Sequence, residues 1–209
     1  YFSMKDMALQ EDILKMPVTS LKIEGRKKTA LYVAAVTAYY RRILDGKGAM
    51  PGGEEDIKQI FSRPWCKFHF NGKDKQVVER RFVGHRGLPI GQVSEASPRS
   101  MRLKTQHKIC RHDGIQIEIP GQEKPAGFSL QKMRVNGKNV FEAAPGDEVE
   151  IMLPPGISLE KGYPVFLASA SSVKGAYGYE RPRPGEFKQQ PMIDVEIKIT
   201  ANQAMATGG

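Results

Sequence analysis

Residues 20–46 read "SLKIEGRKKTALYVAAVTAYYRRILDG", and two different periodicities meet in this stretch. In its first part, leucine and isoleucine alternate with lysine and glutamate, which is the period-2 pattern of a β-strand. The alanine-rich remainder places Val33, Val36, Tyr40 and Leu44 along one face of a helix, and Gly46 follows as a stop signal. The stretch therefore predicts a strand followed by a helix.

The residues before it predict another helix. "SMKDMALQEDILKM" begins at Ser3, a good N-cap, carries apolar residues at helical spacing, and is followed by Pro17. The resulting helix–strand–helix order belongs to an α/β architecture, and residues 1–46 are too few to complete such a domain. We therefore expect this segment to be the end of a larger α/β domain, and the chain to be part of a longer protein.

The rest of the chain changes character. Residues 47–62 combine a glycine-rich linker with a short helix, "EEDIKQIFS". Residues 63–180 hold short strand-like runs separated by turn signals such as "HDG" and "NGK", which favours a small antiparallel β-barrel. Residues 181–209 read as a second linker and the start of a further segment, "IDVEIKIT". The predicted fold class is mixed α and β.

Positive charge is concentrated in one part of the sequence. The net charge is +9, and ten Lys or Arg lie between Lys73 and His112 against three acids, Asp74, Glu79 and Glu95. This bias favours an anionic partner, with RNA the leading candidate, although a solvated basic face without a partner has the same composition. The candidate RNA-binding residues are Arg80, Arg81, His85, Arg86, Arg102, Lys104 and Lys108. His85 and Arg86 lie in "GHRGLPIG", which reads equally as a structural turn.

The sequence gives little indication of a metal site, a membrane-spanning helix or the active-site motif of a common hydrolase. Cys66 with His69, and His107 with Cys110 and His112, have plausible zinc spacing, but alternation along a strand turns His107 away from the other two. We therefore expect no metal site. Two cysteines suit a reducing cytoplasm, and no apolar run approaches the roughly 18 residues of a membrane helix. Signatures of phosphate-binding loops, serine hydrolases and zincins are absent.

The charges of "SLKIEGR" allow two interpretations. If this strand lies in a closed β/α barrel, Leu21 and Ile23 face the helices while Lys22 and Glu24 point into the barrel, with Arg26 at its C-terminal rim. That rim is where such barrels place catalytic groups. Alternatively, Lys22 and Glu24 form an ion pair that only fills space. The pattern by itself leaves both open.

These residues resemble a known family. Ser3, Lys5 and Asp6, the whole of 20–26, and the pairs Tyr32–Val33 and Tyr40–Arg41 resemble the C-terminal end of the catalytic domain of peptidase family U32. "HRGLPIGQV" at 85–93 is similar to the start of that family's C-terminal β-barrel. The resemblance implies that Lys22, Glu24 and Arg26 belong to a functional barrel rim. One departure is "FSRPWCKFHF" at 61–70, which stands where relatives carry an "F-x-R-G-F-T" segment.

A second likeness concerns the predicted barrel. Residues 137–166, "GKNVFEAAPGDEVEIMLPPGISLEKGYPVF", are similar in turn placement to the second domain of elongation factor Tu. That likeness implies a small antiparallel barrel that packs on RNA or on a neighbouring domain.

Family U32 contains collagenase-like proteases and also RNA hydroxylases that use an iron–sulfur cluster and prephenate. The resemblance therefore implies an accessory β-barrel that helps an RNA base hydroxylase bind RNA, with the cluster expected upstream and no cofactor in these residues. The alternatives are a substrate-positioning domain of a protease, and a structural or dimerisation module. In each case we expect the upstream catalytic domain as a partner, a cytoplasmic location, and no catalysis by this chain alone; whether the longer protein is an enzyme stays open.

Overall fold

The computed structural model describes residues 3–70, 72–73, 76–80, 84–122, 124–178, 183, 185–186, 195–200 and 202–208. The chain divides into two compact units, Tyr1–Tyr179 and Glu180–Gly209. The predicted division of the first unit into residues 1–46, 47–62 and 63–180 stays a prediction. No helix within the described ranges is both long and apolar enough to cross a bilayer.

The first segment of the chain is mostly extended, so the helix predicted to begin at Ser3 is wrong. β1 (Ser3–Met4) pairs with β4 (Val78–Glu79), and β2 (Asp6–Met7) pairs with β3 (Trp65–Cys66). Only η1 (Gln10–Lys15) is helical, as a 3₁₀-helix. The backbone N–H of Asp6 donates to the carbonyl of Pro64 at 2.9 Å, and pairing of this kind outweighs local helix propensity.

The segment 20–26 forms no strand, which corrects the second prediction. No backbone in the described part of the chain pairs with it, and a strand needs a neighbour for its N–H and C=O groups. Leu21 and Ile23 keep 41% and 39% of their surface exposed, so they are not sandwiched between a barrel and its helices.

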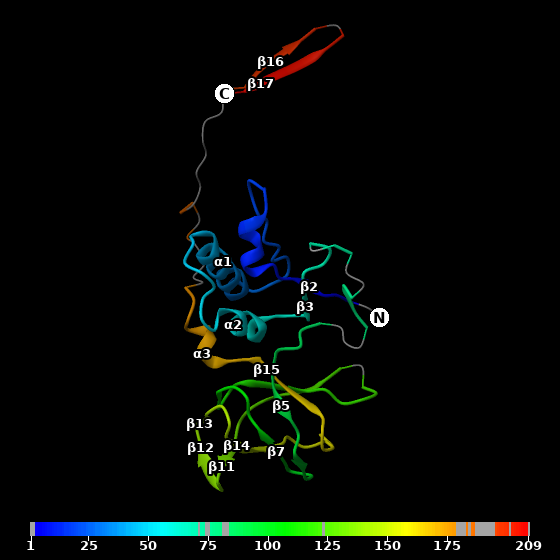
Figure 1. The fold of residues 1–209 in the computed structure, drawn as a ribbon, viewed down its shortest axis with the longest axis vertical. Helices are drawn as coiled ribbons and strands as arrows, with labels where there is room; N and C mark the ends of the chain where they lie inside the picture. The colour runs from blue at the N-terminus through cyan, green and yellow to red at the C-terminus, as the bar shows by residue number, and fades with distance from the viewer. Residues whose placement is uncertain are drawn as a thin grey trace. The chain divides into compact units, whose positions relative to one another are not determined.

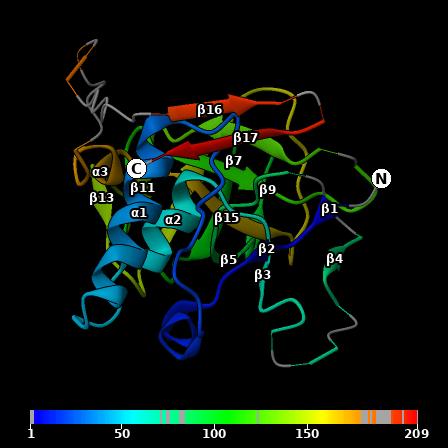
Figure 2. The same cartoon turned by 90° about the horizontal axis from the view of Figure 1, so that it is seen from above.

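The predicted helix after it is confirmed as α1 (Ala30–Leu44). The Thr29 side chain caps it by accepting the backbone N–H of Tyr32 at 3.2 Å. Its buried residues are Ala35, Val36, Tyr39 and Ile43, because this side packs on η1 and on α2 (Gly53–Ile60), which lies beside α1 in Figures 1 and 2. The predicted face shares only Val36 with this side, and its members Val33 and Leu44 are exposed.

Residues 88–169, here called the β region, contain two larger antiparallel sheets and a separate pair of short strands (Figure 1). One has the order β10–β9–β15–β5, formed by Ala126–Ser129, Gly114–Ile117, Pro164–Ser169 and Leu88–Gln92. The other has the order β12–β11–β14–β7–β6, formed by Lys138–Val140, Met133–Val135, Glu148–Met152, Ser100–Lys104 and Glu95–Ala96. β8 (Ile109–Cys110) pairs separately with β13 (Glu142–Ala143).

The core of the β region follows the alternation that the sequence predicts. Met101 and Leu103 on β7 and Val149 and Ile151 on β14 are at most 1% exposed, while the residues between them are only partly buried or exposed. The predicted strands and mixed fold class are thus confirmed. No ladder of backbone hydrogen bonds joins the two sheets edge to edge in the described residues, so barrel closure and the likeness to elongation factor Tu stay predictions.

Two smaller elements complete the chain. α3 (Ser171–Lys174) follows β15 and contacts α2. In the second unit, β16 (Val195–Ile199), predicted as a strand, forms an antiparallel hairpin with β17 (Ala204–Gly208).

Candidate functional site

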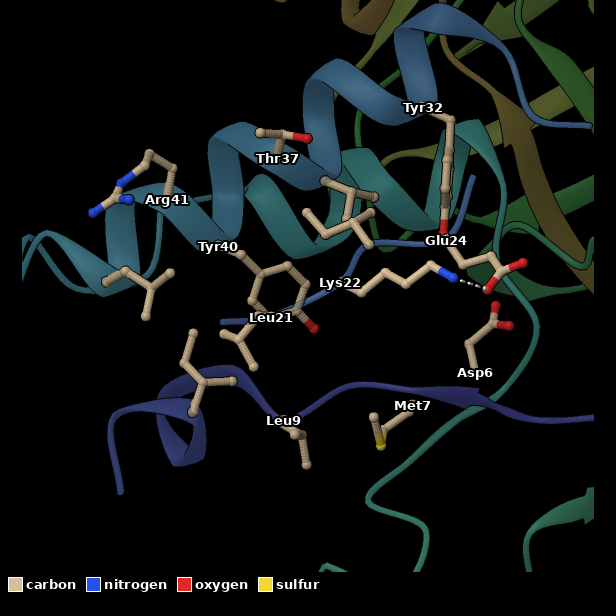
Figure 3. A pocket seen from close by; sticks show the side chains of 14 residues that line it. Asp6, Met7, Leu9, Leu21, Lys22, Glu24, Tyr32, Thr37, Tyr40 and Arg41 are labelled. Atoms are coloured by element: carbon tan, nitrogen blue, oxygen red, sulfur yellow. Dashed lines mark ion pairs between the residues drawn. The ribbon is translucent and has the colours of Figure 1, made fainter. Parts of the chain in front are cut away.

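A pocket of about 440 Å³ lies where residues 21–24 face α1. Most of its wall is apolar: Leu9, Ile13, Leu21 and Ile23 contribute side chains together with Val36 of α1. Because residues 20–26 form no strand, their alternate side chains do not separate onto two faces, and Leu21, Lys22, Ile23 and Glu24 all line the pocket. Figure 3 shows this lining.

The charged groups gather at one end of the pocket. Lys22 Nζ and Glu24 Oε2 lie 3.7 Å apart, and the Asp6 carboxylate points toward the same end (Figure 3). The Lys22 and Glu24 side chains are 86% and 70% exposed, so water weakens their attraction. Arg26 is exposed and is not part of the lining, so the structure brings together only two of the three predicted rim residues.

Asp6 is anchored by Arg63, which follows α2. Its Oδ2 accepts the Arg63 backbone N–H at 2.8 Å, and its Oδ1 accepts Arg63 Nε at 2.7 Å. These bonds hold the carboxylate at the end of β2, where it faces Glu24. Asp6 was not among the candidate site residues chosen from the sequence. The family-like "SMKDM" motif, in which Asp6 stands, could have indicated this residue.

Two tyrosine side chains from α1, together with Thr37 and Arg41 of the same helix, complete the polar part of the lining. Burial raises the pKa of Tyr40 to about 12, and the neighbouring Tyr39 adds to the effect while a backbone hydrogen bond at Leu9 opposes it. Burial also raises the pKa of Tyr32, and the Asp6 carboxylate raises it further. Both hydroxyls therefore keep their protons at neutral pH and can donate hydrogen bonds. Both positions belong to the family-like pattern, which is the signal that could have found them.

This lining suits binding rather than nucleophilic catalysis. It contains no Ser, Cys or His, so it offers no hydroxyl or thiol beside a histidine base. Two carboxylates, one ammonium group, one guanidinium group and three hydroxyls next to an apolar wall can orient a ligand with a polar end and an apolar body. No group of three His, Cys, Asp or Glu residues in the described part of the chain is arranged to hold a metal ion.

His85 and Arg86 are tied into the fold. The Ser62 backbone N–H donates to His85 Nδ1 at 2.9 Å, and His85 Nε2 lies 2.7 Å from the Ala168 carbonyl oxygen, to which it donates as the Nε2–H tautomer. Arg86 forms ion pairs with Glu118 and with Glu79, and its side chain is only 16% exposed. This geometry favours structural roles for both residues over contact with a phosphate backbone.

The other predicted RNA contacts are exposed. Arg102 and Lys108 form surface ion pairs with Glu95 and Glu142 at 3.1 and 2.7 Å, and the Glu142 carboxylate raises the pKa of Lys108. Lys104 lies exposed at the end of β7, and Arg80 is exposed next to β4. Arg81 lies outside the described residues.

Comparison with known proteins gives one family and several relatives. Residues 1–80 match Peptidase family U32. The chain is 26% identical over 146 residues to the 23S rRNA 5-hydroxycytidine C2501 synthase of Escherichia coli (strain K12), covering 62% of this chain and 22% of that protein. It is 24% identical over 187 residues to tRNA hydroxylation protein P of the same organism, covering 80% of this chain and 39% of that protein.

A third relative and one solved structure extend this set. The chain is 28% identical over 155 residues to tRNA hydroxylation protein P1 of Bacillus subtilis (strain 168), covering 73% of this chain and 32% of the relative. The chain thus spans between 22% and 39% of the length of these relatives. The C-terminal domain of a Geobacillus thermoleovorans protein described as a U32 peptidase aligns with a TM-score of 0.33 at 15% identity, covering 37% of this chain and 88% of that domain.

Proposed function

We propose that this protein, whose residues 1–80 match peptidase family U32, acts in the hydroxylation of RNA, with its β region holding the RNA. The observation that carries the proposal is the nature of the relatives. Three similar curated proteins are each named for hydroxylation of transfer RNA or ribosomal RNA. The 187 residues aligned with tRNA hydroxylation protein P outnumber the 80 that match the family, so the similarity continues into the β region.

The electrostatics of the β region support RNA as the partner. Arg102, Lys104 and Lys108 expose their cationic groups, and the carboxylates paired with Arg102 and Lys108 are exposed as well. Surface ion pairs of this kind contribute little to stability because water screens them, so a phosphate group can replace the carboxylate with little loss. Arg and Lys contacts to phosphate supply most of the sequence-independent affinity for nucleic acids.

The pocket beside α1 has a separate part in the proposal. Lys22, Glu24 and Asp6 form its charged end, and we assign them to the rim of the U32 catalytic barrel. Met7, Leu21 and Ile23 expose apolar surface around it, and this surface suits contact with further parts of that barrel. The relatives of this chain are much longer than the chain itself, and we propose that the rest of the barrel corresponds to their additional residues.

The iron–sulfur cluster does not fit on these residues. A cluster of this type is held by four cysteine thiolates, whereas the chain contains only Cys66 and Cys110. We derive no catalytic step through a cluster here and propose that its ligands belong to another part of the longer protein. A cytoplasmic location, as for other enzymes of RNA modification, is part of the same proposal.

The proposal is tested by binding of the 209-residue protein to labelled transfer RNA, measured by fluorescence anisotropy at about 50 mM and about 200 mM salt. The charge-reversal variant Arg102→Glu/Lys108→Glu is compared with Lys27→Glu/Lys47→Glu, which reverses two exposed lysines outside the β region. We expect the first variant to raise Kd about tenfold at the lower salt concentration and the second to leave it within about twofold.

Two outcomes would contradict the proposal. One is an absence of RNA binding at the lower salt concentration. The other is equal or tighter binding of polyglutamate, which would favour a polypeptide partner and thus the protease branch of the family.

A further inference from the structure

A groove of about 510 Å³ lies in the β region, apart from the pocket beside α1. Its walls come from β5, from Ser94, from Lys104 at the end of β7 and Gln106 after it, and from the 161–166 stretch that includes the start of β15. The groove therefore lies where strands of the two sheets meet, and it joins residues that are far apart in the sequence.

Backbone contacts fix this junction. The Gln106 N–H donates to the Ile90 carbonyl at 2.8 Å, and the Gly162 N–H donates to the Val93 carbonyl at 2.8 Å. At Gly91, where φ is +148°, a Cβ would lie 2.8 Å from the Lys104 carbonyl oxygen. Only glycine permits this approach, which holds β5 directly against the end of β7.

The charge of the groove has one sign. Lys104 and Lys161 are its only ionisable lining residues, and neither forms an ion pair with a carboxylate in the described part of the chain. Glu148 faces Lys104 across the β7–β14 ladder and Glu160 precedes Lys161, yet neither lines the groove. Two cations without a lining carboxylate attract an anion.

The remaining lining suits the uncharged parts of a nucleotide. Pro89, Val93, Pro164 and Phe166 supply apolar surface, with Phe166 only 7% exposed at the base of the groove. Gln92 and Gln106 are exposed and supply amide donors and acceptors. Ser94 also lines the groove, and its hydroxyl oxygen is buried without a hydrogen-bond partner among the described residues.

We propose that this groove binds the backbone of single-stranded RNA, with Lys104 and Lys161 contacting phosphate and the apolar wall contacting a base. The inference rests on the proposed function and names its contact surface. A single strand fits better than a duplex, because its bases are free to enter an apolar groove while its phosphates stay at the rim. Lys161 lies outside the basic stretch of the sequence and reaches the groove only through the fold.

The test compares two neutralised variants of the 209-residue protein. Lys104→Gln/Lys161→Gln removes both groove cations, and the matched control Lys132→Gln/Lys138→Gln removes two other exposed lysines of the β region. Binding of fluorescein-labelled oligouridylate is measured by anisotropy over a range of salt concentrations. Equal melting temperatures of the two variants establish that both are folded.

We expect the groove variant to raise Kd about tenfold at about 50 mM salt, and to lower the slope of log K against log salt by about 0.7 for each phosphate that the variant no longer neutralises. The control should keep both values close to those of the unaltered protein, and Lys104→Arg/Lys161→Arg should keep most of the affinity.

The possible failures are distinguishable. If the unaltered protein binds RNA and the two glutamine variants weaken binding equally, or neither does, the groove assignment is wrong while the proposed function stands. If the unaltered protein does not bind RNA, both fail. Preferential binding of a duplex of the same length also overturns the groove proposal.

Discussion

At the scale of single residues, Asp113 links two neighbouring segments of the β region. Its carboxylate is buried, and Oδ2 accepts the backbone N–H of Cys110 at 2.7 Å. Oδ1 accepts both the backbone N–H and the hydroxyl of Ser171, at 2.8 and 2.9 Å. One side chain thus holds the turn at 110–113 and the start of α3 in place.

Replacing Asp113 by alanine should lower the free energy of unfolding by about 3 kcal/mol, because buried donors lose a charged acceptor. Ser171→Ala removes only one of the three hydrogen bonds and should cost about 1 kcal/mol. Urea denaturation of both variants measures the difference. Equal costs would show that the Asp113 carboxylate does not hold the two segments.

The raised pKa of Tyr40 predicts that the folded protein loses stability in alkaline solution. Its pKa is raised by burial from 10.0 to about 12, so the folded protein keeps the phenolic proton over a range of pH in which the unfolded chain loses it. The stabilisation is therefore complete below about pH 10 and is lost as the pH rises toward 12. Burial and the Asp56 carboxylate raise the pKa of Tyr177 as well, which adds to the same loss.

Urea denaturation at several pH values between about 9 and 12 measures this loss, with Tyr40→Phe as the control. The free energy of unfolding of the variant should decline less steeply with pH than that of the unaltered protein. Parallel declines would contradict the assignment to Tyr40.

Individual residues also show why the site could be predicted only in part from the sequence. Lys104 was selected as a candidate phosphate contact and is exposed, because charge and local pattern suffice for that, whereas Lys22 and Glu24 were expected to point into a barrel and are 86% and 70% exposed. The pairing of Arg86 with Glu118, which lies 32 residues further along the chain, could not be foreseen. Lys161 was missed for the same reason, since its neighbours are set by the fold, whereas Asp6 stands in a motif that could have indicated it.

At the scale of elements, prediction succeeded where an element carries its own signals. The turn signal "NGK" between β11 and β12 is local and acts as predicted, since Asn136 and Gly137 adopt φ of 51° and 75° in a hairpin turn. The helix α1 likewise carries its own cap, because the Thr29 side chain accepts the backbone N–H of Tyr32. Residues 3–7 and 20–26 were mispredicted because pairing partners elsewhere in the chain decide whether a segment becomes a strand.

The α1 helix and the unpaired 20–26 segment should differ in how much an alanine substitution lowers the free energy of unfolding. Ile43 on α1 is fully buried, and Ile43→Ala should lower the free energy of unfolding by about 3 kcal/mol. Ile23 is 39% exposed, and Ile23→Ala should cost less than about 1 kcal/mol. Urea denaturation distinguishes them. A large cost at Ile23 would indicate that residues 20–26 are packed as a strand after all.

At the scale of the whole molecule, function depends on how positive charge is distributed among the elements. The net charge of +9 was visible in the sequence. However, His85, Arg86 and Arg63 use their polar groups in internal contacts. The cations left for a partner include Lys104 and Lys161 beside the groove. The sequence therefore gives the net charge directly, whereas the positions of the cations that stay exposed depend on the fold.

The most direct test of the central claim is photochemical crosslinking of the 209-residue protein to RNA that contains 4-thiouridine, with mass spectrometry of the crosslinked peptides. If the β region holds RNA, the crosslinks should fall within 88–106 and 161–169, which form the groove and its rim. Lys104→Gln/Lys161→Gln should reduce their yield. An absence of crosslinks, or crosslinks confined to α1 or to the β16–β17 hairpin, would contradict the claim.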